Sequence, residues 1–175
     1  MKKERKSAVK TAPQKKVDLL FAEYAASHQH PSNQLINWVC IPMILFSVLG
    51  LLWSIPFPHL NFLGRYNGFV NWASFFIAIS GYYYYRLSPV LSYMMILLVF
   101  ALSLLVVQLE KWEAAGGPAV WLVCVITLLF AIGALFIGQK IEGKESSFKT
   151  NVKSVLIGPI WLLKLILLKI GLKSH

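Results

Sequence analysis

The chain has 175 residues, of which 57% are hydrophobic, and its mean hydropathy is +0.63. Soluble domains are usually roughly 45–50% apolar, so this composition excludes an ordinary water-soluble domain and indicates an integral membrane protein. The net charge of +10 could suggest a nucleic-acid partner, but the basic residues cluster at the chain ends, beside apolar runs. No aromatic residues are interleaved with the N-terminal lysines, so we expect contact with an anionic membrane surface and no nucleic acid.

The first 16 residues form a basic tail, which we expect to be disordered, and residues 17–175 are expected to form a single membrane domain. Apolar residues recur at helical spacing from Val17 to Tyr24, which predicts a short amphipathic helix lying on the membrane surface. We expect this helix to end near His28, because a proline at position 31 disfavours helical dihedrals in the residue before it.

Four apolar runs follow that are long enough to cross a hydrocarbon core of roughly 30 Å. They cover residues 35–55, 69–85, 89–109 and 118–138. A fifth run, residues 155–172, contains Lys164 and Lys169, and lysines are costly at the centre of a bilayer, so we predict an interfacial or re-entrant helix there. The expected fold is therefore all-α, a polytopic bundle of four transmembrane helices with an additional helix at each end.

Basic residues in the flanks of these runs predict the orientation. The tail and the segment after residue 138 are rich in lysine. By contrast, the loop between the first and second runs has only Arg65, and the loop between the third and fourth has only Lys111. By the positive-inside rule both termini should lie in the cytosol, and four spans agree with this. A bacterial inner membrane and an endoplasmic-reticulum membrane both fit the pattern. The oligomeric state stays open, because the apolar runs lack a Gly-x-x-x-Gly motif.

Unusual polar residues gather at the predicted cytosolic ends of the spans. Several are three or four residues apart, a spacing that places side chains on one face of a helix. The candidate site residues are Tyr24, His28, His30, Asn33, Asn37, Gln139 and Glu142.

Simpler explanations of these residues stay open. Ser32 or Asn33 could cap the first span. The histidines could be ordinary polar residues of the headgroup region, and Glu142 could be a solvated charge that balances Lys140.

Two motifs carry a resemblance to a known family. The first, Y-x3-H-x4-N-x3-N-x3-I-P, covers Tyr24–Pro42, and the second, F-I-G-Q-K-I-E-G, covers Phe136–Gly143; a G-P-I-W-L-L segment follows at residues 158–163. Together they resemble the membrane family that includes the fungal endoplasmic-reticulum 2-hydroxy-fatty-acid dioxygenase. The similarity extends over nearly the whole chain, from about Val17 onward.

The resemblance implies an iron(II)-dependent oxidoreductase of fatty acid alpha-oxidation, which shortens 2-hydroxy fatty acids by one carbon. The lipid substrate would present its carboxylate and hydroxyl at the headgroup level, and imidazole and carboxylate ligands suit iron(II). On this basis the candidate metal ligands are His28, His30 and Glu142, and the candidate catalytic residues, which would orient the substrate, are Tyr24, Asn33, Asn37 and Gln139.

Two positions depart from the family pattern, because Asn37 and Gln139 stand where the family has histidines. An amide oxygen is a poorer iron ligand than a neutral imidazole, although it keeps hydrogen-bonding capacity. The sequence therefore leaves two functions open. One is a dioxygenase-like protein with an impaired or lost iron site, and the other is a non-catalytic lipid-binding or scaffold membrane protein.

Overall fold

The computed structural model describes residues 16–27, 29–143 and 157–165. Within these ranges the regular elements are all helical and no strand occurs, in agreement with the predicted fold class. The elements are α1 (Lys16–Ser27), α2 (Pro31–Ser54), the 3-10 helix η1 (Asn61–Phe69), α3 (Trp72–Leu87), α4 (Pro89–Ala114) and α5 (Val120–Ile141). Residues 157–165 form a further short helical segment.

Local sequence signals explain where the helices begin. Pro31 and Pro89 occupy the first turns of α2 and α4, where a missing backbone N–H costs nothing. Asn71 begins α3 with a capping box, because its side chain accepts the backbone N–H of Ser74 while the Ser74 hydroxyl accepts that of Asn71. The helix therefore begins at Trp72 and not at the predicted residue 69.

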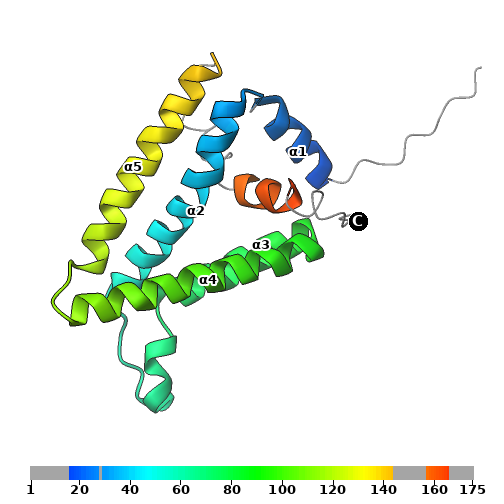
Figure 1. The fold of residues 1–175 in the computed structure, drawn as a ribbon. Coiled ribbons are helices and arrows are strands. Elements are labelled where there is room, and N and C mark those ends of the chain that lie inside the picture. Colours follow the sequence, from blue (N-terminus) through cyan, green and yellow to red (C-terminus); the bar gives the residue numbers. More distant parts are fainter. Residues whose placement is uncertain (1–15, 28, 144–156, 166–175) are drawn as a thin grey trace, which may run out of the picture.

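Figure 1 shows α2 and α5 side by side, and their packing is the most extensive among the helices α1 to α5 that the structure describes. Helices α3 and α4 form a second pair, which contacts α2 and extends at a wide angle to α2 and α5. The helical segment 157–165 packs against α1 and α2, with Trp161 4.9 Å from Tyr24 between ring centroids. The N-terminal end of α2 thus meets the C-terminal end of α5 and the short helix α1.

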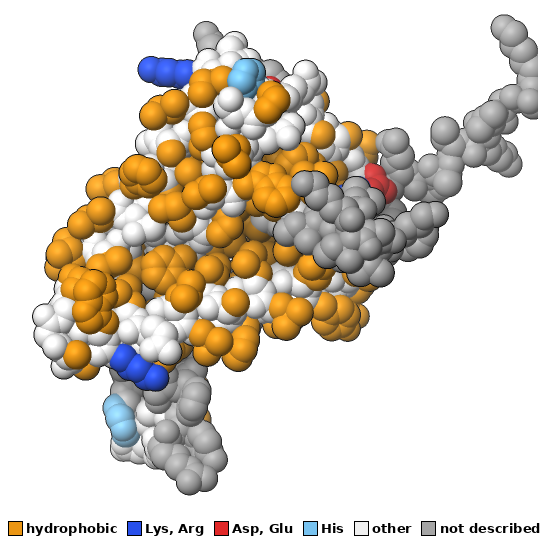
Figure 2. All heavy atoms as spheres, viewed as in Figure 1, with side chains coloured by type: hydrophobic (Ala, Val, Ile, Leu, Met, Phe, Trp, Pro, Cys, Tyr) orange, Lys and Arg blue, Asp and Glu red, His pale blue; other side chains and the backbone are white. Residues whose placement is uncertain are grey.

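Three helices are long and apolar enough to span a membrane. They are α2, α4 and α5, with 24, 26 and 22 residues and hydropathies of 2.3, 2.8 and 2.8. Their outer surfaces are apolar, and Figure 2 shows hydrophobic side chains over most of the visible face, with basic side chains near its ends. This is the surface that a hydrocarbon environment requires.

Helix α3 differs from the prediction of a fourth full span. Its 16 residues extend about 24 Å, which is less than the roughly 30 Å of a hydrocarbon core. The capping box delays its start, and Ser88 and Pro89 end it. Of the four predicted spans, the structure therefore supports three. The fourth span and the location of the termini in the cytosol stay predictions.

The short C-terminal helix lies inside the protein over the part that the structure describes. Residues 157–163 are buried, and Lys164 pairs with Asp18 at 3.5 Å and lies 4.4 Å from the centroid of the Phe21 ring. The apolar side of α1, including Phe21 and Tyr24, is consequently covered by protein. Residues 155–156 and 166–172 of the predicted helix and residues 1–15 of the tail lie outside the described residues.

Candidate functional site: a polar cluster where three helices end

Four of the predicted site residues form a polar cluster, which we define as Tyr24, Asn33, Asn37 and Glu142. They come from α1, α2 and the residue that follows α5. The two asparagines lie one turn apart on α2 and are only 1% and 3% exposed, although they sit in an apolar helix. Burying an amide without hydrogen-bond partners is costly in free energy, so the partners of these two amides show how the site is held together.

Hydrogen bonds connect the cluster from one end to the other. The Tyr24 hydroxyl donates to Asn37 Oδ1 at 3.3 Å. Asn37 Nδ2 donates to the Asn33 carbonyl oxygen at 2.8 Å and to Asn33 Oδ1 at 3.0 Å. Asn33 Nδ2 then donates to Glu142 Oε2 at 2.9 Å. Each amide is therefore used in both directions, as donor and as acceptor.

Glu142 closes the network against the N-terminal end of α2. Its Oε1 accepts the backbone N–H of Gln29 at 2.6 Å, and its Oε2 accepts that of His30 at 3.1 Å. A carboxylate at a helix N-terminus is stabilised by these N–H groups and by the helix dipole. Glu142 therefore holds two chain segments together, a function that its interpretation as a solvated charge did not predict.

His30 is the N-cap of α2, in place of Ser32 or Asn33. Its Nδ1 accepts the backbone N–H of Ser32 at 3.2 Å. A neutral imidazole that accepts at Nδ1 carries its proton on Nε2, so in this orientation neither nitrogen offers a lone pair to a metal. His28, the other predicted nitrogen ligand, lies outside the described residues.

Tyr24 is buried at the closed end of the cluster. Burial raises the pKa of its hydroxyl well above the ordinary value, so the group stays protonated and acts as a hydrogen-bond donor. The asparagine amides do not titrate. The chain of bonds from Tyr24 to Glu142 can thus fix the orientation of its members, but it does not provide a route for protons.

Two glycines that were not predicted as site residues make the cluster possible. A Cβ atom at Gly138 would lie 2.5 Å from Asn33 Oδ1. A Cβ atom at Gly158 would collide with the Ile41 side chain and would lie 3.3 Å from the Tyr24 hydroxyl oxygen. Both glycines belong to the motifs that carry the family resemblance, so membership in these motifs was the sequence feature that could have identified them. Gln139 lies next to Gly138 on the last turn of α5, with its side-chain oxygen buried.

The described donors do not fit an iron site. Among the residues that the structure describes, which leave out His28, no group of three or more His, Cys, Asp or Glu side chains could hold a metal ion. The Glu142 oxygens and the Asn33 amide oxygen accept hydrogen bonds from within the protein. Iron(II) would have to displace these donors, and the amides at positions 37 and 139 are weaker ligands than imidazole.

Fold and site together define a class: an all-helical protein with three helices able to span a membrane and a largely buried polar cluster where two of them, α2 and α5, meet α1. The family is identified by comparison. The model of the family described as Mpo1-like, 2-hydroxy-palmitic acid dioxygenase Mpo1-like, matches residues 14–170, and the chain belongs to this family. No curated protein and no solved structure matches the chain.

Proposed function

We propose that this chain is a 2-hydroxy fatty acid dioxygenase-like membrane protein with an impaired iron site. The observation that carries the proposal is the family match over residues 14–170, which includes every member of the polar cluster. The cluster lies where α2 and α5 meet at their ends, and we expect this end at the depth where a lipid acid in the bilayer presents its carboxylate and hydroxyl groups.

The residues of the cluster suit the head of a 2-hydroxy acid in different ways. The amide of Gln139, next to the cluster, has the chemistry to donate to and accept from a substrate hydroxyl. Asn37 and Tyr24 are bonded to each other, so they would exchange that bond for bonds to the substrate, with the Tyr24 hydroxyl kept neutral by burial. Glu142 places a negative charge nearby, which three N–H donors and the α2 N-terminus partly offset. A bound carboxylate is therefore tolerated best on the amide side of the cluster.

A second function, a non-catalytic lipid-binding or scaffold protein, is favoured by one specific observation. The described members of the cluster satisfy one another by hydrogen bonds, so the site is stable without a metal. This candidate differs from the first in that it predicts lipid binding with no turnover.

The decisive experiment compares the purified protein with the double variant Asn37→His/Gln139→His, which restores the imidazoles of the family pattern. Bound iron is measured by elemental analysis, and turnover of 2-hydroxypalmitate with iron(II) and oxygen is followed by the acid one carbon shorter. Asn61→His, an exposed position in η1, is the matched control. We expect little iron and slow turnover in the original chain and in the control, and more of both in the double variant.

The other outcomes are equally informative. Stoichiometric iron and fast turnover in the original chain would contradict an impaired site. Retained binding of 2-hydroxypalmitate without turnover in either protein would favour the non-catalytic function. If neither protein binds the acid, both candidates are wrong.

We also propose that α3 crosses as a shorter fourth span, so that both termini lie in the cytosol, where their basic residues contact anionic lipid. The charge distribution between the termini and the loops supports this topology. Labelling of single cysteines at Ser7 and at Ser174 with an impermeant reagent tests it. Labelling from the outside at either position would contradict the proposal.

A further inference from the structure

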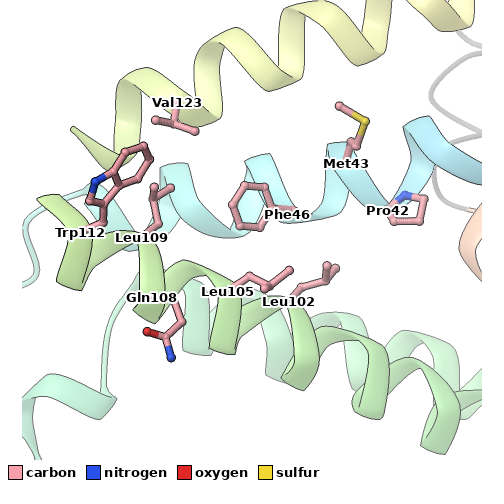
Figure 3. A pocket seen from close by; sticks show the side chains of 9 residues that line it. All are labelled: Pro42, Met43, Phe46, Leu102, Leu105, Gln108, Leu109, Trp112 and Val123. Atoms are coloured by element: carbon pink, nitrogen blue, oxygen red, sulfur yellow. The ribbon is translucent and has the colours of Figure 1, made fainter. Parts of the chain in front are cut away.

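A groove lies between α2, α4 and α5, on the side of α2 that faces away from the polar cluster. It has a volume of about 490 Å³, within the usual range of ligand sites. Figure 3 shows its lining residues, among them Pro42 and Phe46 of α2, Leu102, Leu105 and Trp112 of α4, and Val123 of α5. At about 100° per residue, Pro42 and Phe46 lie about 140° and 180° around α2 from Asn37, so the groove and the cluster are separate sites.

The groove extends over the depth of one leaflet. On α4 it begins at Trp112 and ends at Leu102, a distance of about 15 Å along the helix axis. This is half of a hydrocarbon core of roughly 30 Å. On α2 it ends at Pro42, near the middle of the 24-residue helix. The groove therefore has the length of one acyl chain that enters from the end of α4.

The two ends of the groove differ in their surroundings. Apolar side chains line the groove, and although Gln108 belongs to the lining near the outer end, Figure 3 shows its amide turned away from α2. The exposed charges Glu110, Lys111 and Glu113 lie within two turns of it, at the end of α4. Glu113 is held at this end by the backbone N–H of Val120, which donates to its carboxylate at 3.0 Å.

We propose that the groove binds one acyl chain of a zwitterionic phospholipid, in the leaflet opposite the polar cluster. Its walls belong to the three helices able to span a membrane, so the surrounding medium supplies hydrocarbon chains and no water. Glu110, Lys111 and Glu113 lie outside the lining of the groove, but at the level of its outer end along α4, where two carboxylates and one lysine complement a headgroup that carries both signs. The same charges disfavour the single negative charge of a free fatty acid.

The test uses the full chain in nanodiscs of phosphatidylcholine that contain a small fraction of a phosphatidylcholine with a photoreactive group on its acyl chain. Cross-linked peptides are mapped by mass spectrometry. We expect labelling to concentrate on the residues that line the groove. The variant Leu105→Trp fills the groove, and labelling should fall by about tenfold, which corresponds to the loss of about two buried methylene groups.

The matched control is Leu129→Trp, which adds the same side chain at an exposed apolar position of α5 outside the groove and should leave labelling unchanged. If Leu105→Trp does not fold, the smaller change Val123→Leu serves the same purpose. Equal labelling of the outward-facing side of α4, for example at Leu97, would overturn the proposal. Preferential labelling by a photoreactive free fatty acid, or competition by palmitate, would also overturn the assignment to a phospholipid.

Discussion

Replacement of Asn33 by alanine tests the polar cluster most directly, because this side chain links its two halves. Asn33 is 1% exposed, donates to Glu142 Oε2 at 2.9 Å and accepts from Asn37 Nδ2 at 3.0 Å. A hydrogen bond to a charged group contributes about 1.5–3 kcal/mol and a neutral one about 0.5–1.5 kcal/mol. We expect Asn33→Ala to lower the free energy of unfolding by about 2–4 kcal/mol.

The measurement is reversible unfolding in detergent micelles, with Leu35→Ala as the control. Leu35 lies two residues away on α2 and is 68% exposed, so its truncation should change stability by no more than about 0.5 kcal/mol. If Asn33→Ala were as stable as this control, the hydrogen-bonded cluster would not exist in the protein as described.

Three further predictions use the same assay. Gly138→Ala places a Cβ atom 2.5 Å from the Asn33 amide oxygen and should cost about 1–3 kcal/mol, whereas Gly133→Ala, which meets open space on the same helix, should be neutral or stabilising. An equal effect of the two substitutions would contradict the close approach. Tyr24→Phe should cost about 1 kcal/mol at neutral pH. Since the folded state raises the pKa of Tyr24, the unmodified chain should lose stability as the pH rises above about 10, the ordinary tyrosine pKa, and the Phe variant should show a smaller loss. Asp18→Asn removes a partly exposed ion pair and should cost less than about 1 kcal/mol, with a difference that vanishes at high salt.

The positions of the helices could be predicted because they depend on local chemistry. Long apolar runs produced α2, α4 and α5, and the prolines at 31 and 89 mark where two helices begin. The prediction was less accurate at α3, where side-chain capping by Asn71 moved the start of the helix. Capping depends on the conformation of single residues, which hydropathy does not report.

Four polar residues that the structure brings together, Tyr24, Asn33, Asn37 and Glu142, could be named from the sequence, but their contacts could not be predicted. Spacing placed Asn33 and Asn37 on one face of a helix, and the family motifs singled out Glu142. Nothing in the spacing indicated that Glu142 would bind the backbone at the start of α2, more than a hundred residues away. The same holds for His30, whose Nδ1 caps α2 by accepting the backbone N–H of Ser32.

The sequence by itself determined an apolar, all-helical chain with its polar residues at the ends of the helices, because these properties follow from composition and from periodicity along one segment. Only the tertiary structure decided that Gly138 lets two helices approach closely enough for Asn33 and Glu142 to bond. It also decided that the C-terminal helix covers α1 and that α2, α4 and α5 leave a groove between them. These features depend on how helices distant in sequence pack, and a pattern within one helix does not contain that information.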